Sequence, residues 1–493
     1  MECEPGNQPG SLLSAKKYLP MTYRPSLFTL CALLLLSACT ATPDNKPQPP
    51  NIVFILIDDM GYGDLSITGN ERVSTPNLDT LAFEGKLIEQ FYVASPICSP
   101  SRVALFTGRY PSDFQIHSFI HTRQANQRRD MANFLPESTF TLADLARRAG
   151  YRTHHIGKWH MGGGRDIGEA PHPAAYGFDT SYVSFEGLGN RLLFADHQNR
   201  LSQQSAALGQ GSIDWQPKHT TTQIYIDKAI EAMSQHNEKP FYLQLWLNDV
   251  HAPFMPSNTH LSAISKGGTN AQQAFDAVLK NTDAQLGRLF RHIKQSGKDA
   301  NTLIIVTSDN GPASNPRYYQ NGEQPPGSTA GLRGRKWSLY EGGIRMPLLV
   351  KWPAQVTAGV RDRTSVITAL DLLPTLADVM NVNADDADGE SRISVLTSQE
   401  LQARSRTMMW EFGSTGDPAA HPRPANKRDL SPLLAIRDKN WKLLVNPDGS
   451  NVQLYNLSLD PFESKNLADD YPHITARLSK QVIAWRTRFR AAQ

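Results

Sequence analysis

The stretch that decides the fold is Asn51–Ile57, with the sequence NIVFILI, followed directly by Asp58 and Asp59. An unbroken apolar run rich in β-branched residues is typical of a strand that is buried on both faces of a parallel sheet. Two adjacent carboxylates at the end of such a strand are costly to bury unless a cation lies between them. Oxygen ligands favour Ca²⁺ or Mg²⁺, so the sequence predicts a divalent metal site here, with a solvated turn as the alternative.

Two later segments repeat this order of apolar strand and polar end. Phe241–Leu247 is followed by His251, and Thr302–Thr307 is followed by Asp309 and Asn310. Helical patterns separate the strands, and strands that alternate with helices build parallel sheets with sites at the carboxyl ends. We therefore predict an α/β fold with a large, mixed, mostly parallel sheet flanked by helices.

The pattern of apolar segments changes after about residue 384. Short apolar pieces separated by turn residues predict an antiparallel sheet, followed by a helix from about Pro472. We therefore expect a large first domain over 51–390, to which the candidate site residues belong, and a smaller C-terminal antiparallel-sheet subdomain over 391–493. Upstream, the weak periodicity of residues 162–220 predicts long loops over the sheet edge.

The composition is that of an ordinary globular protein rather than a disordered or membrane-embedded one. The chain has 493 residues, of which 40% are hydrophobic, and a formal net charge of +3. It contains no long run of basic residues, so we expect no nucleic-acid partner.

The N-terminus has the pattern of an export signal, with Met21 as an alternative start. The apolar run Phe28–Leu36 is too short to span a bilayer and has the length of a secretory core region. The sequence LSAC that ends at Cys39 resembles a bacterial lipobox. Cys39 would then be lipidated after a signal peptide over 1–38, followed by a tether over 39–50; ordinary signal-peptidase cleavage is the alternative. We expect an exported periplasmic or outer-membrane lipoprotein that contacts membrane only through its lipid.

Cysteine usage singles out Cys98. Cys3 and Cys31 belong to the leader and Cys39 to the lipid anchor, so Cys98 is the one cysteine left for the folded part. One internal thiol cannot form an internal disulfide, which favours a chemical role over that of a buried structural thiol. Arg102 follows four residues later, on the same face of a predicted helix.

A predicted strand over 151–160 ends in a second group of charged residues. Alternation places Lys158 and His160 on the same face of an extended chain, and a later basic cluster contains Lys336. A cation and a titratable ring that point the same way suit an anionic substrate, although such residues are more often ordinary surface residues.

Elsewhere, a helix is expected from Thr75 through Leu87.

Several of these segments match the motifs of one protein family and occur in the same order along the chain as in that family. The sequence CSPSR at Cys98–Arg102 fits a Cys-x-Pro-x-Arg motif, and Gly150–His160 fits a second, longer motif. The remaining matches are Asp58, Asp59, His251, Asp309, Asn310, Lys336 and the segment 455–467. On these residues the chain resembles the type I sulfatases of the alkaline phosphatase superfamily. The resemblance covers nearly all of the chain after residue 50 and implies an alkaline-phosphatase-like fold and sulfate-ester hydrolysis.

The resemblance also implies a modified cysteine and a metal. Cys98 would be oxidised to Cα-formylglycine (3-oxoalanine) by a formylglycine-generating maturase. The hydrate of this aldehyde can take up the sulfuryl group and then release sulfate, which splits one difficult step into two. One Ca²⁺ would be bound, although oxygen ligands alone also admit Mg²⁺. The implied metal ligands are Asp58, Asp59, Cys98, Asp309 and Asn310.

The implied catalytic roles follow from the same motifs. Arg102, Lys158 and Lys336 would neutralise the sulfate oxygens during transfer. His251, with Lys336, would protonate the departing alcohol, and His160 would take the proton whose removal triggers sulfate release.

The expected substrate is a sulfated poly- or oligosaccharide, because export and long polar loops around the site suit such a substrate. The candidate substrate contacts are His117, Arg165, Arg191, His197, Arg317, His421 and Arg423. A phosphonate or phosphodiester hydrolase of the same superfamily is one alternative, which relative rates on aryl sulfates and aryl phosphodiesters would distinguish. A glycan-binding relative without catalysis is another, and it would require Cys98 to stay unmodified or a ligand to be missing.

Overall fold

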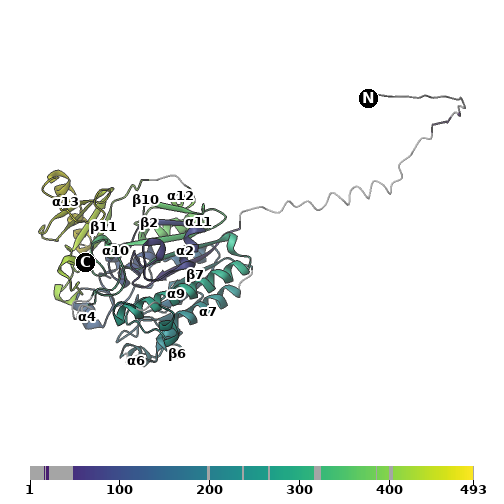
Figure 1. The fold of residues 1–493 in the computed structure, drawn as a ribbon, viewed down its shortest axis with the longest axis horizontal. Coiled ribbons are helices and arrows are strands. Elements are labelled where there is room, and N and C mark those ends of the chain that lie inside the picture. The colour runs from purple at the N-terminus through teal and green to yellow at the C-terminus, as the bar shows by residue number, and fades with distance from the viewer. Residues whose placement is uncertain are drawn as a thin grey trace, which may run out of the picture. The chain divides into compact units, whose positions relative to one another are not determined.

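The computed structural model describes residues 16, 18–20, 48–196, 200–235, 238–264, 267–315, 324–384, 386–398 and 403–491. The chain divides into two units, 1–48 and 49–493, and every element described below belongs to the second (Figure 1). In the part of the chain that the structure describes, no helix has the length and apolar character needed to cross a bilayer. Cys39, the predicted lipidation site, lies outside the described residues.

The larger unit is built on a ten-stranded sheet in the order β10-β2-β9-β8-β1-β7-β3-β4-β5-β6. Seven of its nine neighbouring pairs are parallel, and β9 is antiparallel to both β2 and β8. The predicted large, mixed, mostly parallel sheet is therefore confirmed. Its strands are β1 Asn51–Ile57, β2 Lys86–Tyr92, β3 Arg152–Lys158, β4 Thr180–Ser184, β5 Arg191–Phe194, β6 Ile213–Gln216, β7 Phe241–Trp246, β8 Thr302–Ser308, β9 Arg345–Lys351 and β10 Val360–Thr368.

Strand β1 lies in the interior of the sheet, and its side chains alternate between two apolar cores. Phe54 and its even-numbered neighbours pack with α3, α5 and α11 on one face, whereas Ile55 and its odd-numbered neighbours pack with α2, α7 and α9 on the other. Figure 1 shows α7 and α9 side by side. Burial on both faces explains why the NIVFILI run is apolar throughout.

The helices that form these layers and the shorter connecting helices have the following bounds. They are α2 Pro76–Phe83, α3 Cys98–Thr107, α4 Arg123–Arg128, α5 Leu142–Arg148, α6 Arg200–Ala207, α7 Thr221–Ser234, α8 Asn258–Ser262, α9 Asn270–Gln295, α10 Glu341–Ile344, α11 Leu372–Met380, α12 Ile393–Thr397 and α13 Pro472–Ala491.

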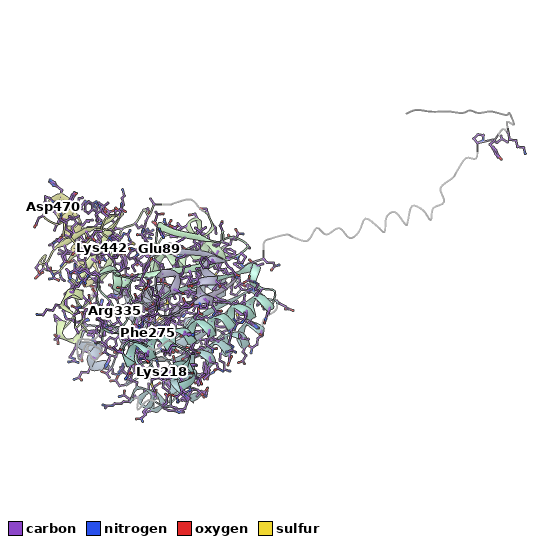
Figure 2. The ribbon with its side chains drawn as sticks, viewed as in Figure 1. Glu89, Lys218, Phe275, Arg335, Lys442 and Asp470 are labelled. Atoms are coloured by element: carbon purple, nitrogen blue, oxygen red, sulfur yellow. The ribbon has the colours of Figure 1, made fainter. Side chains whose placement is uncertain are left out.

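A second, four-stranded antiparallel sheet follows in the chain, as predicted. It comprises β11 Met408–Glu411, β12 Leu434–Asp438, β13 Trp441–Val445 and β14 Gln453–Asn456. One face packs on α13 through a small apolar core that includes Leu443 and Leu478. Lys442 of β13 (Figure 2) is fully buried, and its Nζ lies 2.9 Å from a carboxylate oxygen of both Glu341 and Glu463. This triad connects the second sheet to the start of α10.

The structure corrects three local predictions. Residues 162–220 are not loops alone: they contain β4, β5 and β6, which extend the main sheet, together with α6. The helix that begins after Thr75 ends at Phe83, because the chain turns at Gly85 and enters β2. At Gly85 a Cβ would lie 2.2 Å from the Val350 carbonyl oxygen, so only glycine allows β9 to pass this closely. The predicted strand alternation, which would place Lys158 and His160 on the same face, does not reach His160. Strand β3 ends at Lys158, and His160 has a left-handed φ of 55°.

Candidate active site

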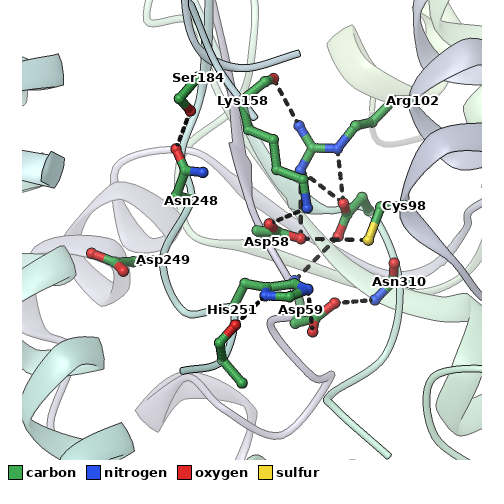
Figure 3. Close-up of polar contacts among 12 residues, drawn as sticks. Asp58, Asp59, Cys98, Arg102, Lys158, Ser184, Asn248, Asp249, His251 and Asn310 are labelled. Carbon is green, nitrogen blue, oxygen red and sulfur yellow. Dashed lines mark hydrogen bonds and ion pairs between the residues drawn. The ribbon is translucent and has the colours of Figure 1, made fainter. Parts of the chain in front are cut away.

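Four adjacent strands of the main sheet, β8, β1, β7 and β3, bring their polar ends to one edge. The residues that follow or end these strands are, in the same order, Asp309 and Asn310, Asp58 and Asp59, His251, and Lys158. Figure 3 shows Cys98, which begins α3, at one side of a cluster that contains Asp58, Asp59, Lys158, His251 and Asn310. The carboxyl edge of a parallel sheet is where such folds place their sites.

Asp58 is fully buried and lies among cations. One of its carboxylate oxygens is 2.5 Å from Lys158 Nζ, and the other is 3.6 Å from an Arg102 nitrogen. Burial raises the pKa of Asp58, but Lys158, His251 and Arg102 outweigh this effect and hold that pKa at about 2. The carboxylate is therefore charged at neutral pH.

Asp59 is held in a left-handed backbone conformation with a φ of 59°. Its N–H donates to Asp309 Oδ1 at 3.1 Å, and its Oδ1 accepts a bond from Asn310 Nδ2 at 2.7 Å and forms an ion pair with Lys336. Its Oδ2 lies 3.6 Å from His251 Nε2. These contacts fix both carboxylate oxygens of a residue whose backbone is strained, a combination common at functional sites.

The donor set at this edge suits a hard divalent cation. Asp58, Asp59, Cys98 and His251 each offer one ligand atom within 4.8 Å of the others. Asn310 Oδ1 is buried and has no hydrogen-bond partner among the described residues, so this oxygen is free to coordinate a cation. Carboxylate and amide oxygens are the ligands that Ca²⁺ and Mg²⁺ prefer, so the residues present fit such an ion.

Cys98 is buried, with 2% of its surface exposed, at the first position of α3. Its Sγ lies 3.2 Å from Lys336 Nζ and 3.8 Å from Asp58 Oδ1. Burial raises the pKa of the Cys98 thiol to about 12, although Lys158 and Lys336 oppose this effect. At neutral pH the unmodified side chain is therefore a protonated thiol rather than a nucleophilic thiolate.

Arg102 lies one turn further along α3 and is also fully buried. Its Nε and one terminal nitrogen donate to the same oxygen of Asp309, at 3.0 and 2.8 Å, and its other terminal nitrogen donates to the Lys158 carbonyl at 3.1 Å. The guanidinium also lies 5.3 Å from the centre of the Trp246 ring. Arg102 is thus a fixed positive charge that joins the ends of β8 and β3.

Gly157 explains how β3 can approach β7 closely enough to place Lys158. Its φ of 108° is unfavourable for other residues, and a Cβ there would lie 1.9 Å from the Trp246 carbonyl oxygen. Any larger residue would push β3 away from β7 and move the Lys158 ammonium from Asp58.

The two histidines of the site differ in their surroundings. His251 Nδ1 lies 2.6 Å from the Ala252 carbonyl oxygen; burial lowers the pKa of His251 to about 4, although Asp59 opposes this effect. His160 is buried beside the Phe185 ring, and neither of its ring nitrogens has a hydrogen-bond partner in the described part of the chain. Burial, together with Lys158 and Arg102, lowers the pKa of His160 well below the ordinary value. Both rings are therefore mainly neutral at neutral pH.

Two of the seven candidate substrate contacts, His197 and Arg317, lie outside the described residues. A third, Arg191, is corrected by the structure. It is 1% exposed, and its three side-chain nitrogens donate to Ser205 Oγ and to four backbone carbonyls, one in α6 and three in neighbouring loops. Because every nitrogen is engaged, Arg191 stabilises α6 and these loops rather than contacting substrate.

The other four candidates stay predictions, and two of them, His117 and His421, are only 5% exposed. Arg165 forms an ion pair with Glu186 at 2.8 Å, close enough to the site to lower the pKa of His160. His117 lies 3.3 Å from a carboxylate oxygen of Glu411, and His421 Nε2 donates to the Thr415 carbonyl at 2.8 Å. Arg423 is exposed and lines a small cavity with His421 and Trp337.

Sequence reasoning missed residues that hold the site in place. Glu411 ends β11 and binds His117, Ser112 and Ser414. Its position as a carboxylate at the end of a strand is a signal by which the sequence could have identified it. Lys218 is buried against the loop that carries His251, and no motif in the sequence indicates this contact.

The comparisons with known proteins agree with this geometry. The sulfatase family model matches residues 50–382, and a model described as N-sulphoglucosamine sulphohydrolase, C-terminal, matches residues 334–488. The chain is 32% identical over 345 residues to the mouse (Mus musculus) N-acetylgalactosamine-6-sulfatase, covering 66% of this chain but 62% of that protein. It is 27% identical to an N-acetylgalactosamine-6-O-sulfatase of Bacteroides thetaiotaomicron, covering 93% of this chain and 98% of that protein.

A solved structure extends the similarity to three dimensions. The crystal structure of Ps i-CgsB in complex with k-i-k-neocarrahexaose matches with a TM-score of 0.72 and 27% identity, covering 89% of this chain and 93% of that chain. The sulfatase model alone spans more than half of the chain and includes every residue of the charged cluster around Cys98. By its motifs, its fold and these matches, the chain belongs to the sulfatase family.

Proposed function

We propose that this protein hydrolyses sulfate esters of a carbohydrate, using a formylglycine derived from Cys98 and a bound Ca²⁺. The observation that carries the proposal is the convergence of two carboxylates, three cations and His251 on Cys98 at the N-terminus of α3. This arrangement combines a site for a divalent cation with positive charge for an anionic substrate, which is the combination that sulfate transfer requires.

The metal would be held by oxygen atoms at the ends of β1 and β8. The proposed ligands are Asp58, Asp59, Asp309, Asn310 and the converted side chain of residue 98. The unpartnered Asn310 Oδ1 supports this assignment. When bound, the cation would act as a Lewis acid toward a sulfate oxygen.

Conversion of Cys98 by a maturase is supported by its motif and its chemical state. Cys98 is a free cysteine among the described residues, and burial disfavours its thiolate form. The formylglycine hydrate would supply a nucleophilic hydroxyl and a second hydroxyl through which sulfate can be released.

The remaining roles belong to side chains of this chain. Lys158 and Lys336 hold ammonium groups on either side of the aspartate pair, where they can neutralise sulfate oxygens as charge develops. Arg102 contributes a third positive charge and keeps Asp309 in place. His251, in the form that carries a hydrogen on both ring nitrogens, would donate the Nε2 proton to the departing alcohol. His160, whose ring nitrogens have no partner among the described residues, would accept the proton whose removal releases sulfate.

The carbohydrate class is supported by what the similar proteins are named for. The mouse and Bacteroides relatives are named for N-acetylgalactosamine-6-sulfate chemistry, and the Ps i-CgsB crystal contains a neocarrahexaose. The four remaining substrate candidates would contact hydroxyls or further sulfates of the glycan.

The test uses protein produced together with a formylglycine-generating maturase. Intact-mass analysis of the residue-98 peptide should show conversion of the thiol, and free sulfate should be released from at least one of a panel of defined sulfated saccharides, beginning with N-acetylgalactosamine-6-sulfate. Cys98→Ala is the matched control and should release none. An unmodified thiol in a host able to convert it would contradict the proposal, as would faster hydrolysis of an aryl phosphodiester than of an aryl sulfate.

We also propose that the protein is exported and anchored through a lipid on Cys39. The apolar run before an LSAC sequence supports this assignment. Cys39→Ala should abolish labelling with a fatty-acid probe and release the protein from the membrane fraction; unchanged labelling would contradict the lipobox.

A further inference from the structure

Lys218 is a buried lysine that lies outside the charged cluster of the site. It is labelled in Figure 2 and begins the short turn Lys218–Thr220 that leads into α7. Its side chain is 5% exposed. A buried ammonium is costly unless acceptors surround it, so its partners indicate what it does.

All three acceptors of the Lys218 ammonium lie in the loop that follows β7. Nζ donates to the His251 carbonyl at 2.9 Å and to the Pro253 carbonyl at 2.8 Å, and it lies 3.5 Å from Asp249 Oδ1. The two carbonyls belong to His251 itself and to the residue two positions later. One side chain therefore holds both ends of the segment that positions the histidine ring.

Lys218 is itself held firmly by its own neighbours. Its backbone N–H donates to both carboxylate oxygens of Asp196, at 3.0 and 3.1 Å, and its carbonyl accepts a bond from the Thr221 hydroxyl at 2.7 Å. The next residue of α7, Thr222, donates to Asp249 Oδ2 at 2.6 Å. The start of α7 thus provides a rigid support for the loop.

The sheet side of the loop is fixed separately. Asp58 N–H donates to the Asp249 carbonyl at 3.1 Å, and Val250 N–H donates to the Asp58 carbonyl at 2.9 Å. These bonds tie the beginning of the loop to β1 but do not reach the backbone of His251. Figure 3 shows Asp249 apart from the charged cluster, while the His251 ring points toward Asp59.

The contacts of the His251 ring show which of its two nitrogens faces the reacting groups. The Ala252 carbonyl only accepts, so at 2.6 Å the Nδ1 atom carries a hydrogen. Nε2, which lies 3.6 Å from Asp59 Oδ2, is then the atom that first takes up a proton from solvent and then passes it to the reacting groups. A shift of the backbone at 251–253 would move Nε2 by a similar amount.

We propose that Lys218 is a positioning residue for proton donation by His251: its ammonium fixes the carbonyls of His251 and Pro253 and so aims Nε2 at the oxygen of the departing alcohol. The inference rests on the proposed function. Because an error of about 1 Å can cost a factor of roughly 100 in rate, the loss of this support should be visible in the chemical step.

The test uses Lys218→Met, which keeps the length of the side chain and removes the ammonium. Lys228→Met on α7 is the matched control, because Lys228 is half exposed and pairs with Glu231 at the surface. Both variants are produced with Cys98 fully converted, and kcat and KM are measured for phenyl sulfate and 4-nitrophenyl sulfate. Phenolate is a poor leaving group that needs a proton, whereas 4-nitrophenolate leaves readily as the anion.

Lys218→Met should lower kcat for phenyl sulfate by about 10- to 100-fold and kcat for 4-nitrophenyl sulfate by less than about threefold, with KM little changed. The control should match the wild type on both esters. In a His251→Gln background, Lys218→Met should add no further difference between the two esters. Equal losses on both esters, unchanged rates, or an additional difference in the His251→Gln background would each overturn the assignment.

A second variant tests the proposal if Lys218→Met does not fold. If Lys218→Met lacks the far-ultraviolet circular dichroism spectrum of the wild type, Lys218→Arg is measured instead, since it keeps the charge but cannot place one nitrogen between both carbonyls. It should show the same preference for the better leaving group, and an equal loss on both esters would refute the inference. A converted wild-type enzyme that releases no sulfate from any ester would instead contradict the proposed function itself.

Discussion

The buried triad of Lys442, Glu341 and Glu463 gives a prediction whose size follows from the structure. All three side chains have no exposed surface, and the Lys442 ammonium lies 2.9 Å from each carboxylate. Lys442→Met keeps most of the volume but leaves two carboxylates without their shared cation. Glu341 would retain the Tyr92 hydroxyl at 2.6 Å and Arg345 at 3.7 Å, whereas Glu463 would retain the Glu341 N–H at 2.7 Å.

Removing one partner of a buried ion pair costs about 3–5 kcal/mol, because the charge that remains is buried without compensation. We expect Lys442→Met to lower the free energy of unfolding by this amount. The exposed pair of Lys465 and Asp470 provides the control: their atoms are 3.6 Å apart and their side chains are 75% and 56% exposed. Lys465→Met should change the free energy of unfolding by less than about 1 kcal/mol.

The assay is unfolding in urea, followed by circular dichroism and tryptophan fluorescence, at pH 7.5. The double variant Lys442→Met with Glu463→Gln should recover part of the loss, because a neutral amide needs no cation. The reasoning would be refuted if Lys442→Met cost no more than Lys465→Met, or if the double variant were less stable than Lys442→Met alone.

Three further predictions concern the site and its support. Cys98→Ala should abolish sulfate release while the free energy of unfolding changes by less than about 2 kcal/mol, since it removes one small buried atom; loss of the urea transition would contradict this. Asn310→Ala should weaken Ca²⁺ binding at least about tenfold, as measured by calorimetric titration of the converted enzyme, because a buried amide oxygen without a partner is lost; an unchanged affinity would exclude that oxygen as a ligand. Burial raises the pKa of Glu463 from 4.5 to about 7, although Lys442 opposes this effect, so its contribution to stability is present below about pH 4.5 and is lost as the pH rises through 7. Glu463→Gln lacks this loss and should gain up to about 3 kcal/mol relative to the wild type between pH 4.5 and 8 in urea unfolding; a constant difference across that range would contradict the assignment.

The central strands and the site were predictable from the sequence because both depend on local patterns. An apolar run followed by a polar residue marks the end of a buried strand, and parallel topology then brings these ends together without further information. This reasoning placed Asp58, Asp59 and His251 at one edge, where the structure has them. Cys98 was identified by counting, because the other cysteines precede the fold.

Strands β4, β5 and β6 were missed because they lack the pattern of a central strand. They have four or five residues each, and β6, with the sequence IDWQ, is only half buried. The conformation of His160 depends on where β3 stops, which alternation cannot indicate. Lys218 could not be found because its partners are backbone carbonyls about 35 positions away, and backbone atoms leave no trace in the sequence.

Lys442 and Glu341 are 101 positions apart in the chain, so their contact can form only after the second sheet has been synthesised. Residue 98 leaves the ribosome long before Lys442 and Glu463, and until these emerge the segment that carries Lys336 lacks its support from the second sheet. In the finished fold Cys98 is 2% exposed, so a modifying enzyme has no access to it. The proposed conversion of Cys98 would therefore take place before the chain has folded around residue 98.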